Sequence, residues 1–237
     1  MKTGDLYNEI RDYCLANQDE SNVKKYQRYF KEEFKAYGLS RGLVEAKAKE
    51  ITSRPDMSLS TVLELAPLLL RSPKYEKTSI AILLLLSFHK QWTRETFNSV
   101  ERWFAIGITN WAHADYLGGE VIPRFMDKKL IVMDTLQPWR NAKNKFQRRV
   151  AVVGLIKPMK RSPDFQAYFE FISPMMSDPE REVHQGLGWF LREAWKKQPG
   201  PTEIFLMKWK DTAPRLIFQY ATEKMTTEGK LRFRKQK

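Results

Sequence analysis

Apolar side chains recur at helical spacing along almost the whole chain, and this periodicity most narrows the possible folds. Leu6, Ile10 and Cys14, for example, stand at i, i+4 and i+8, which places them on one face of a helix. No segment alternates apolar and polar residues as a half-buried strand does. We therefore expect an all-α protein with helices over residues 5–16, 21–37, 41–53, 58–70, 74–90, 93–107, 113–126, 128–139, 145–158, 164–176, 180–197, 201–210 and 214–225.

The expected helices form pairs that repeat at a nearly constant interval. A short polar or proline-containing turn precedes the second helix of each pair near Glu76, Asp115, Arg149 and Gln185, at intervals of 39, 34 and 36 residues. Two helices per unit at this period are typical of HEAT-like solenoids, which stack antiparallel pairs around a continuous core and present a concave face. We expect a single α-helical repeat domain over residues 1–237 with a concave basic face; an irregular helical bundle is the alternative. The basic tail, residues 230–237, is expected to be frayed.

The charge balance indicates a polyanionic partner. The chain has 41 Lys and Arg against 28 Asp and Glu, a formal net charge of +13, and nucleic acid is the commonest partner of such a surface. One cysteine excludes an internal disulfide and any metal site built from several cysteines, and three histidines argue against a His-rich metal site. The longest apolar run, residues 80–86, is too short to span a bilayer, and the N-terminus has no signal-peptide pattern. We expect a cytoplasmic protein without membrane contact.

The densest positive charge lies in residues 140–161, which contain no acidic residue. Its cations are Arg140, Lys143, Lys145, Arg148, Arg149, Lys157, Lys160 and Arg161. Most of them precede an apolar run and so crowd a helix N-terminus, where the helix dipole favours anions. Such an arrangement favours an external anion such as a phosphate. A solvated basic loop is the alternative.

Two further segments combine tryptophan with a charged residue at helical spacing. Trp111 and Asp115 stand at i and i+4, so a helix places them side by side. The carboxylate could face a cationic sugar while the indole contacts a sugar or base; alternatively Trp111 is core and Asp115 is a helix cap or an ion-pair partner. Trp189 and Arg192 stand at i and i+3 on a later helix. There, too, the tryptophan can be a core residue.

Taken in order, these segments resemble the HEAT-like-repeat DNA alkylation repair glycosylases of the AlkD type. The resemblance rests on Trp111 with Asp115, on residues 146–151 (FQRRVA), on residues 188–193 (GWFLRE) and on residues 28–34 (RYFKEEF) with Gly38-Leu39. The matches run across nearly the whole chain with similar spacing. Three positions depart from the family pattern, namely Asn110, Ala112 and Phe146, and these departures bear on activity more than on fold.

The resemblance implies a function and a role for each matched residue. It implies a concave, basic groove that holds double-stranded DNA, and hydrolysis of the N-glycosidic bond of cationic N3- or N7-alkylated purines. We expect the protein to be a monomer. Asp115 would stabilise the oxocarbenium sugar and orient a water, while Trp111 and Trp189 would pack on the deoxyribose. Arg149 would bind a backbone phosphate. The other expected DNA contacts are Lys145, Arg148, Arg192 and Tyr29; no cofactor and no metal is implied.

Two other functions fit the same sequence. One is a DNA-binding relative without catalysis, directed to branched or distorted DNA, in which Asp115 would be dispensable. The other is a helical solenoid that binds an acidic protein. Binding that weakens steeply with salt would indicate DNA, because DNA releases condensed counterions when it is bound.

Overall fold

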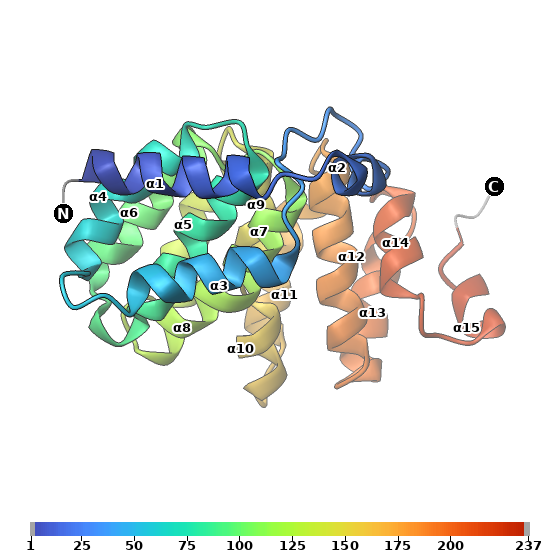
Figure 1. Cartoon of the computed structure of the whole chain (residues 1–237). Coiled ribbons are helices and arrows are strands. Elements are labelled where there is room, and N and C mark those ends of the chain that lie inside the picture. Colours follow the sequence, from blue (N-terminus) through green and yellow to red (C-terminus); the bar gives the residue numbers. More distant parts are fainter. Residues whose placement is uncertain (1–2, 235–237) are drawn as a thin grey trace. The chain divides into compact units, whose positions relative to one another are not determined.

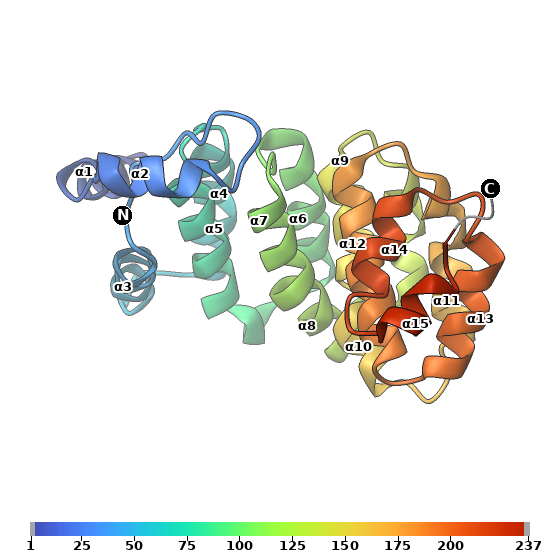
Figure 2. The same ribbon diagram turned by 90° about the vertical axis from the view of Figure 1, so that its right-hand side faces the viewer.

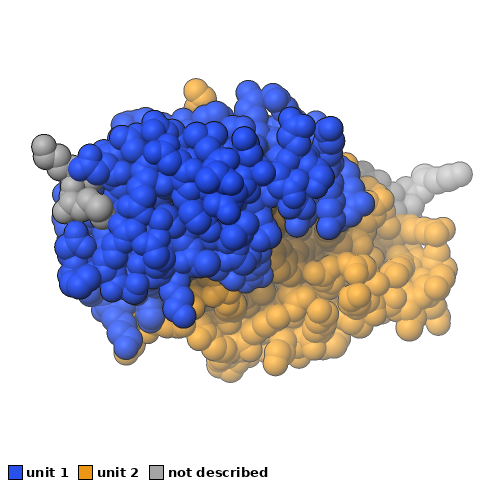
Figure 3. All heavy atoms as spheres, viewed as in Figure 1, with its two compact units in different colours: residues 1–109 blue, residues 110–237 orange. Residues whose placement is uncertain are grey.

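The computed structural model describes residues 3–234, and every regular element among them is helical (Figure 1). The expected all-α fold is confirmed. The chain divides into two compact units, residues 1–109 and 110–237, which are coloured separately in Figure 3. Each unit is built from packed helices with its own apolar core. The expectation of one continuous repeat domain stays a prediction.

In the first unit, α4 and α5 pack against each other and against the other helices. Helix α4 packs against α1 and α6, and α5 packs against α1 and α3. The side chains of Ser40, Ser58 and Thr93 accept backbone N–H bonds at the starts of α3, α4 and α6, which fixes where these helices begin. The elements are α1 (Thr3–Ala16), α2 (Glu20–Gln27), α3 (Arg41–Thr52), α4 (Leu59–Leu70), α5 (Tyr75–Ser87), the 3-10 turn η1 (His89–Gln91) and α6 (Arg94–Ile106).

The prediction of a helix over residues 21–37 is wrong beyond Gln27, where α2 ends and a loop follows. The Gln27 side-chain amide donates to the carbonyls of Phe30 and Glu32 and accepts from the N–H of Phe34, so backbone groups are satisfied without a helix. Phe34 stacks on Phe30 with ring centroids 4.5 Å apart. Aromatic residues at helical spacing thus close a loop instead of lining a helix face.

Glu76, at the start of α5, holds the end of this loop. Its carboxylate is 2% exposed and accepts the backbone N–H groups of Tyr37, Gly38 and Leu39 at 2.9, 2.7 and 3.2 Å. Gly38 has φ +87°, and an added Cβ would lie 2.0 Å from the carbonyl oxygen of Asp19. Both the backbone angle and the space at this position therefore require glycine.

In the second unit, four helices pack in succession, α7 on α9, α9 on α12 and α12 on α14. They begin at Trp111, Lys145, Arg181 and Arg215, at intervals of 34, 36 and 34 residues, which reproduces the repeat period of the sequence. Figure 2 shows α9, α12 and α14 side by side. The elements are α7 (Trp111–Tyr116), the π-helical turn η2 (Leu117–Val121), α8 (Ile122–Asp127), the 3-10 segment η3 (Met133–Asn141), α9 (Lys145–Val153), α10 (Ile156–Arg161), α11 (Gln166–Ile172), the 3-10 turn η4 (Ser173–Ser177), α12 (Arg181–Trp195), α13 (Pro199–Trp209), α14 (Arg215–Ala221) and α15 (Thr227–Leu231).

Two expectations for this unit are corrected. Residues 128–139 do not form an α-helix, because Lys129 adopts a left-handed conformation (φ 56°) that ends α8, and a 3-10 segment containing Pro138 follows. The tail is not frayed over residues 230–234. There Phe233 is fully buried and its carbonyl accepts a hydrogen bond from Arg215. Residues 235–237 of the expected tail lie outside the described residues.

Candidate functional site

The start of α7 is set by Asn110, which leaves Asp115 available for another role. The Asn110 side chain accepts the backbone N–H of His113 at 3.0 Å, so α7 begins at Trp111. Trp111 is 38% exposed, so it is not a core residue. Asp115 follows one turn later on the same helix and does not cap it. Of the structural roles considered for Asp115, the helix cap is excluded.

Asp115 forms a two-pronged ion pair with Arg149 of α9. Arg149 Nε donates to Oδ1 at 2.7 Å and Nη2 donates to Oδ2 at 2.9 Å. Arg149 Nη1 donates to the main-chain carbonyl of Glu182 in the first turn of α12. The side chains of Arg149 and Asp115 are 7% and 19% exposed. One guanidinium therefore joins α7, α9 and α12 and holds both carboxylate oxygens in place.

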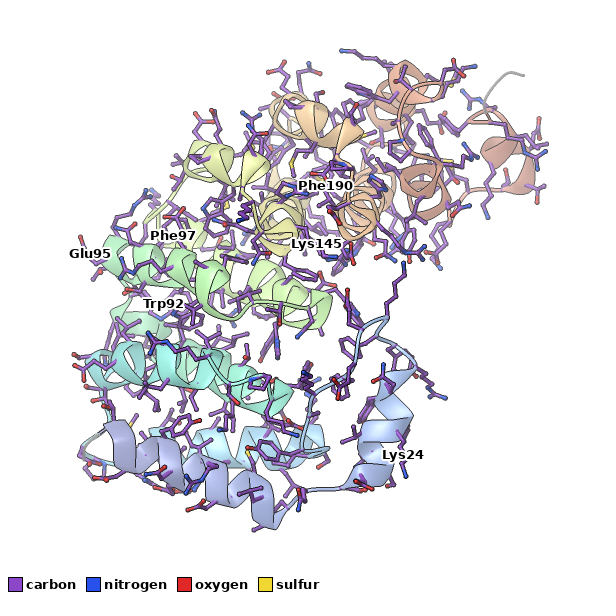
Figure 4. All side chains as sticks on the ribbon, turned by 90° about the horizontal axis from the view of Figure 1, so that it is seen from above. Lys24, Trp92, Glu95, Phe97, Lys145 and Phe190 are labelled. Carbon is purple, nitrogen blue, oxygen red and sulfur yellow. The ribbon has the colours of Figure 1, made fainter. Side chains whose placement is uncertain are left out.

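Six of the eight cations in the acid-free run pair with acids from distant parts of the sequence. Arg148 pairs with Asp178 at 2.6 Å, and Lys145 pairs with Glu182 at 2.9 Å; Lys145 is labelled in Figure 4. The remaining pairs are Lys157 with Glu120, Lys160 with Glu193 and Arg161 with Asp127, while Arg140 donates to the carbonyl of Phe171. The lack of local acids therefore does not by itself indicate an external anion. Phosphate binding by Lys145, Arg148 and Arg149 stays a prediction.

Trp189 and Arg192 lie on α12, which is also in contact with α9. Trp189 is half-buried, whereas its neighbour Phe190, labelled in Figure 4, is fully buried. Arg192 pairs with Glu223 beyond α14 and with Glu193. The placement of Trp189 beside Asp115 and the DNA contact of Arg192 stay predictions.

Tyr29 lies in the first unit, just after α2. It is 55% exposed, and its hydroxyl accepts a hydrogen bond from Arg28 at 2.8 Å. The Arg28 guanidinium lies 4.8 Å from the centre of the Tyr29 ring. The two side chains form an exposed basic and aromatic pair of the kind that contacts nucleic acid, and its contact with DNA stays a prediction.

Sequence reasoning missed Glu182, which serves two of the three candidate cations of α9, Lys145 and Arg149. Its carbonyl accepts from Arg149 and its carboxylate pairs with Lys145. The repeat period contained a usable signal, because Glu182 stands in the first turn of α12, one period after the first turn of α9. Residues one period apart on successive parallel helices are neighbours in a stacked array.

Among residues 3–234, no group of three or more His, Cys, Asp and Glu side chains is arranged to hold a metal ion. Over the same residues, no helix has the length and apolar character needed to cross a bilayer.

Comparison of the sequence with models of known protein families shows which family the chain belongs to. The sequence model of a family described as "DNA alkylation repair enzyme" matches residues 11–225. The chain belongs to this family. Membership supports a role in DNA alkylation repair with DNA as the partner. No curated protein is similar enough in sequence to count as a match.

Solved structures of family members share the fold. A predicted DNA alkylation repair enzyme from Enterococcus faecalis superposes with a TM-score of 0.73 at 17% identity, covering 89% of this chain and 98% of that one. AlkD2 from Streptococcus mutans superposes with a TM-score of 0.59 at 20% identity, covering 86% and 99%. At these sequence identities the likeness establishes that this chain has the helical-repeat fold of those structures.

Proposed function

We propose that this alkylation repair family member is a DNA glycosylase that hydrolyses the N-glycosidic bond of cationic N3- or N7-alkylated purines in duplex DNA. The observation that carries the proposal is the fixed carboxylate of Asp115, one turn after the exposed Trp111. A positively charged base is a good leaving group, so positive charge develops on the sugar as the bond breaks. A carboxylate already held in place stabilises that charge without reorganising.

Arg149 has a double role in this proposal. Two of its bonds orient the Asp115 carboxylate, and a third anchors the guanidinium to the carbonyl of Glu182. A guanidinium has five N–H donors, so two remain for a phosphate oxygen beside the lesion. Trp111 and Trp189 would pack on the deoxyribose, and neither a metal nor a cofactor takes part.

The net charge of +13 supplies the long-range attraction for DNA. Lys145, Arg148 and Arg192 would contact the backbone by exchanging part of their pairing with Glu182, Asp178 and Glu223 for phosphates. Because those carboxylates remain nearby, each such contact is weaker than one from an unpaired cation. We propose that the protein acts as a monomer, with the duplex along its basic face.

The test is release of 7-methylguanine from methylated DNA by wild type and Asp115→Asn. We expect Asp115→Asn to lower the excision rate by about 10²-fold or more, the scale for losing a pre-organised electrostatic group. The substitution also weakens the ion pair with Arg149, so the melting temperature falls as well. Glu76→Gln is the matched control, because it removes another buried carboxylate charge that has no part in the proposed site.

The results separate the assignments. Excision by Glu76→Gln at the wild-type rate per folded molecule, with excision by Asp115→Asn nearly abolished, supports the role of Asp115. Excision by Asp115→Asn at the rate of Glu76→Gln contradicts it.

A second candidate is a DNA-binding relative without catalysis. It is favoured by one observation, that both oxygens of Asp115 are already occupied by Arg149, as expected of a purely structural link between successive repeats. Wild-type protein that binds methylated duplex DNA but releases no base would support this alternative and refute the glycosylase.

A further inference from the structure

Helix α9 is contacted on two sides by glycines, at the level of Arg149 and of Val153 one turn later. On the side of α7 and η2, a methyl group added at Gly118 would lie 2.9 Å from Val153 Cγ1 and 3.0 Å from its Cβ. On the side of α12, a methyl group added at Gly186 would lie 3.3 Å from Arg149 Cγ and 3.5 Å from Val153 Cγ2. At position 118 the approach to α9 leaves no room for a methyl group, whereas at position 186 a methyl group would be tight.

The glycine contacts and the ion pair lie on the same faces of their helices. Gly118 comes three residues after Asp115, and Val153 comes four residues after Arg149, spacings that put residues on one helix side. The contact of Gly118 with Val153 is therefore one turn away from the contact of Asp115 with Arg149. The separation of the two helices at the first contact sets the separation at the second.

Val153 cannot yield to a larger residue at position 118. It is 1% exposed, and a β-branched side chain in a helix has one strongly preferred rotamer. A methyl group at 118 must therefore push α7 and η2 away from α9. Hydrogen bonds of 2.7 and 2.9 Å between Asp115 and Arg149 weaken steeply when stretched.

Gly186 acts on the other partner of the pair. A methyl group there would touch the Arg149 stem directly, at a distance that is tight but can be relieved by a small shift. That shift would move the guanidinium relative to Asp115 and to the carbonyl of Glu182, which it also binds. Its effect is smaller than that of a methyl group at 118.

We propose that Gly118 and Gly186 are positioning residues that set the spacing of α7, α9 and α12 and thereby the geometry of the Asp115–Arg149 pair. The catalytic consequence rests on the proposed glycosylase function, whereas the effect on the pair does not. Neither glycine contacts DNA in this proposal. Their substitution lowers the rate of base release more than the DNA affinity, which falls only through the single phosphate contact proposed for Arg149.

The first experiment measures single-turnover release of 7-methylguanine together with DNA affinity, well below the melting temperature. A misplacement of about 1 Å can cost about 10²-fold in rate, so Gly118→Ala is expected to lower the rate at least about tenfold and Gly186→Ala less. Ile217→Val is the control, because it loosens the core at a fully buried position of α14, a helix that packs mainly on α12. It is expected to lower the melting temperature without changing the rate.

A rescue variant separates positioning from general destabilisation. Val153→Ala removes the Cγ1 atom at 2.9 Å but leaves the Val153 Cβ at 3.0 Å and the backbone nitrogen of Gly154 at 3.2 Å, so Gly118→Ala with Val153→Ala is expected to recover part of the lost rate. General destabilisation predicts the opposite, because two destabilising changes add. A double variant no faster than Gly118→Ala, or a Gly118→Ala variant with wild-type rate, overturns the proposal.

The second readout is independent of excision. The Arg149 Nε–H resonance in an NMR spectrum reports its bond to Asp115, and slow exchange with solvent is expected in wild type and in Ile217→Val. Faster exchange in Gly118→Ala, slowed again when Val153→Ala is added, supports the positioning role even if the wild-type protein releases no base and the proposed function fails. Unchanged exchange in Gly118→Ala overturns it.

Discussion

The Asp115–Arg149 pair can be tested as a structural unit by a double-mutant cycle of Asp115→Asn, Arg149→Met and the double variant. Arg149→Met keeps most of the side-chain volume but leaves Asp115 and the Glu182 carbonyl without their donor. Asp115→Asn leaves a guanidinium that is 7% exposed without its counter-charge. The double variant removes both charges. Replacing a buried pair as a whole costs far less than breaking it.

The expected energies follow from the geometry. Two unit charges about 4 Å apart attract by about 4 kcal/mol at an effective dielectric constant of about 20. Asp115 is 19% exposed, so solvent reduces this value, and we expect a coupling energy of about 2 kcal/mol. Removing one partner of a buried pair costs about 3–5 kcal/mol, and Arg149→Met is expected near the lower end. The double variant should be more stable than Arg149→Met alone.

The assay is urea unfolding followed by tryptophan fluorescence, which Trp111 and Trp189 report from the same unit as the pair. The four proteins are compared at one ionic strength, and the unfolding slopes must agree for the free energies to be comparable. A coupling energy below about 0.5 kcal/mol, the usual limit of additivity for independent sites, would refute the inference that the pair is coupled. A double variant less stable than Arg149→Met would refute the reasoning on unpaired charge.

Three further predictions concern the first unit. The hydrogen bond from Arg54, and after it the one from Lys47, lowers the pKa of Glu9 from 4.5 to about 2 despite partial burial. These bonds to the Glu9 carboxylate therefore stabilise the fold above about pH 4.5, and the effect is lost as the pH falls towards 2. The pKa shift corresponds to about 3 kcal/mol, which we discount to about 1 kcal/mol because Glu9 is 34% exposed. Acid unfolding of Glu9→Gln should therefore show a shallower loss of stability over that range, and identical curves would contradict it. Burial raises the pKa of Cys14 to about 12, so a maleimide at pH 8 should label it only at the rate of unfolding; rapid labelling of native protein would contradict this. Glu76→Gln should cost about 2–3 kcal/mol, measured by urea unfolding, because the amide can accept only part of the three backbone N–H bonds; a cost near zero would show that water replaces the carboxylate.

Local patterns predicted most of the fold. The helix starts at Arg41, Leu59 and Arg94 follow from the capping residues that precede them. The repeat period was readable because every pair of helices must bury an apolar face against the next pair. The expected helices are absent over residues 28–37 and 128–139. In the first segment the Gln27 side chain bonds to the backbone groups, and in the second the left-handed conformation of Lys129 ends the helix.

For the site, the sequence identified the charged residues but not their partners. Asp115 and Arg149 were both singled out, yet their direct contact spans 34 residues and depends on how α7 packs on α9. The same holds for Arg148 with Asp178 and for Lys145 with Glu182, whose acids lie one repeat further along the chain.

The sequence by itself determined that this chain is helical, repetitive and basic, because helix formation, capping and net charge depend on residues near one another or on composition alone. Only the tertiary structure decided which charges remain available to a ligand. An ion pair forms where packing brings the nitrogen of a cationic side chain within about 4 Å of a carboxylate oxygen, and stacked helices bring together residues one repeat apart. In the sequence, the cation-rich residues 140–161 suggest an anion site. In the folded protein, most of their positive charges are paired with carboxylates from other parts of the chain.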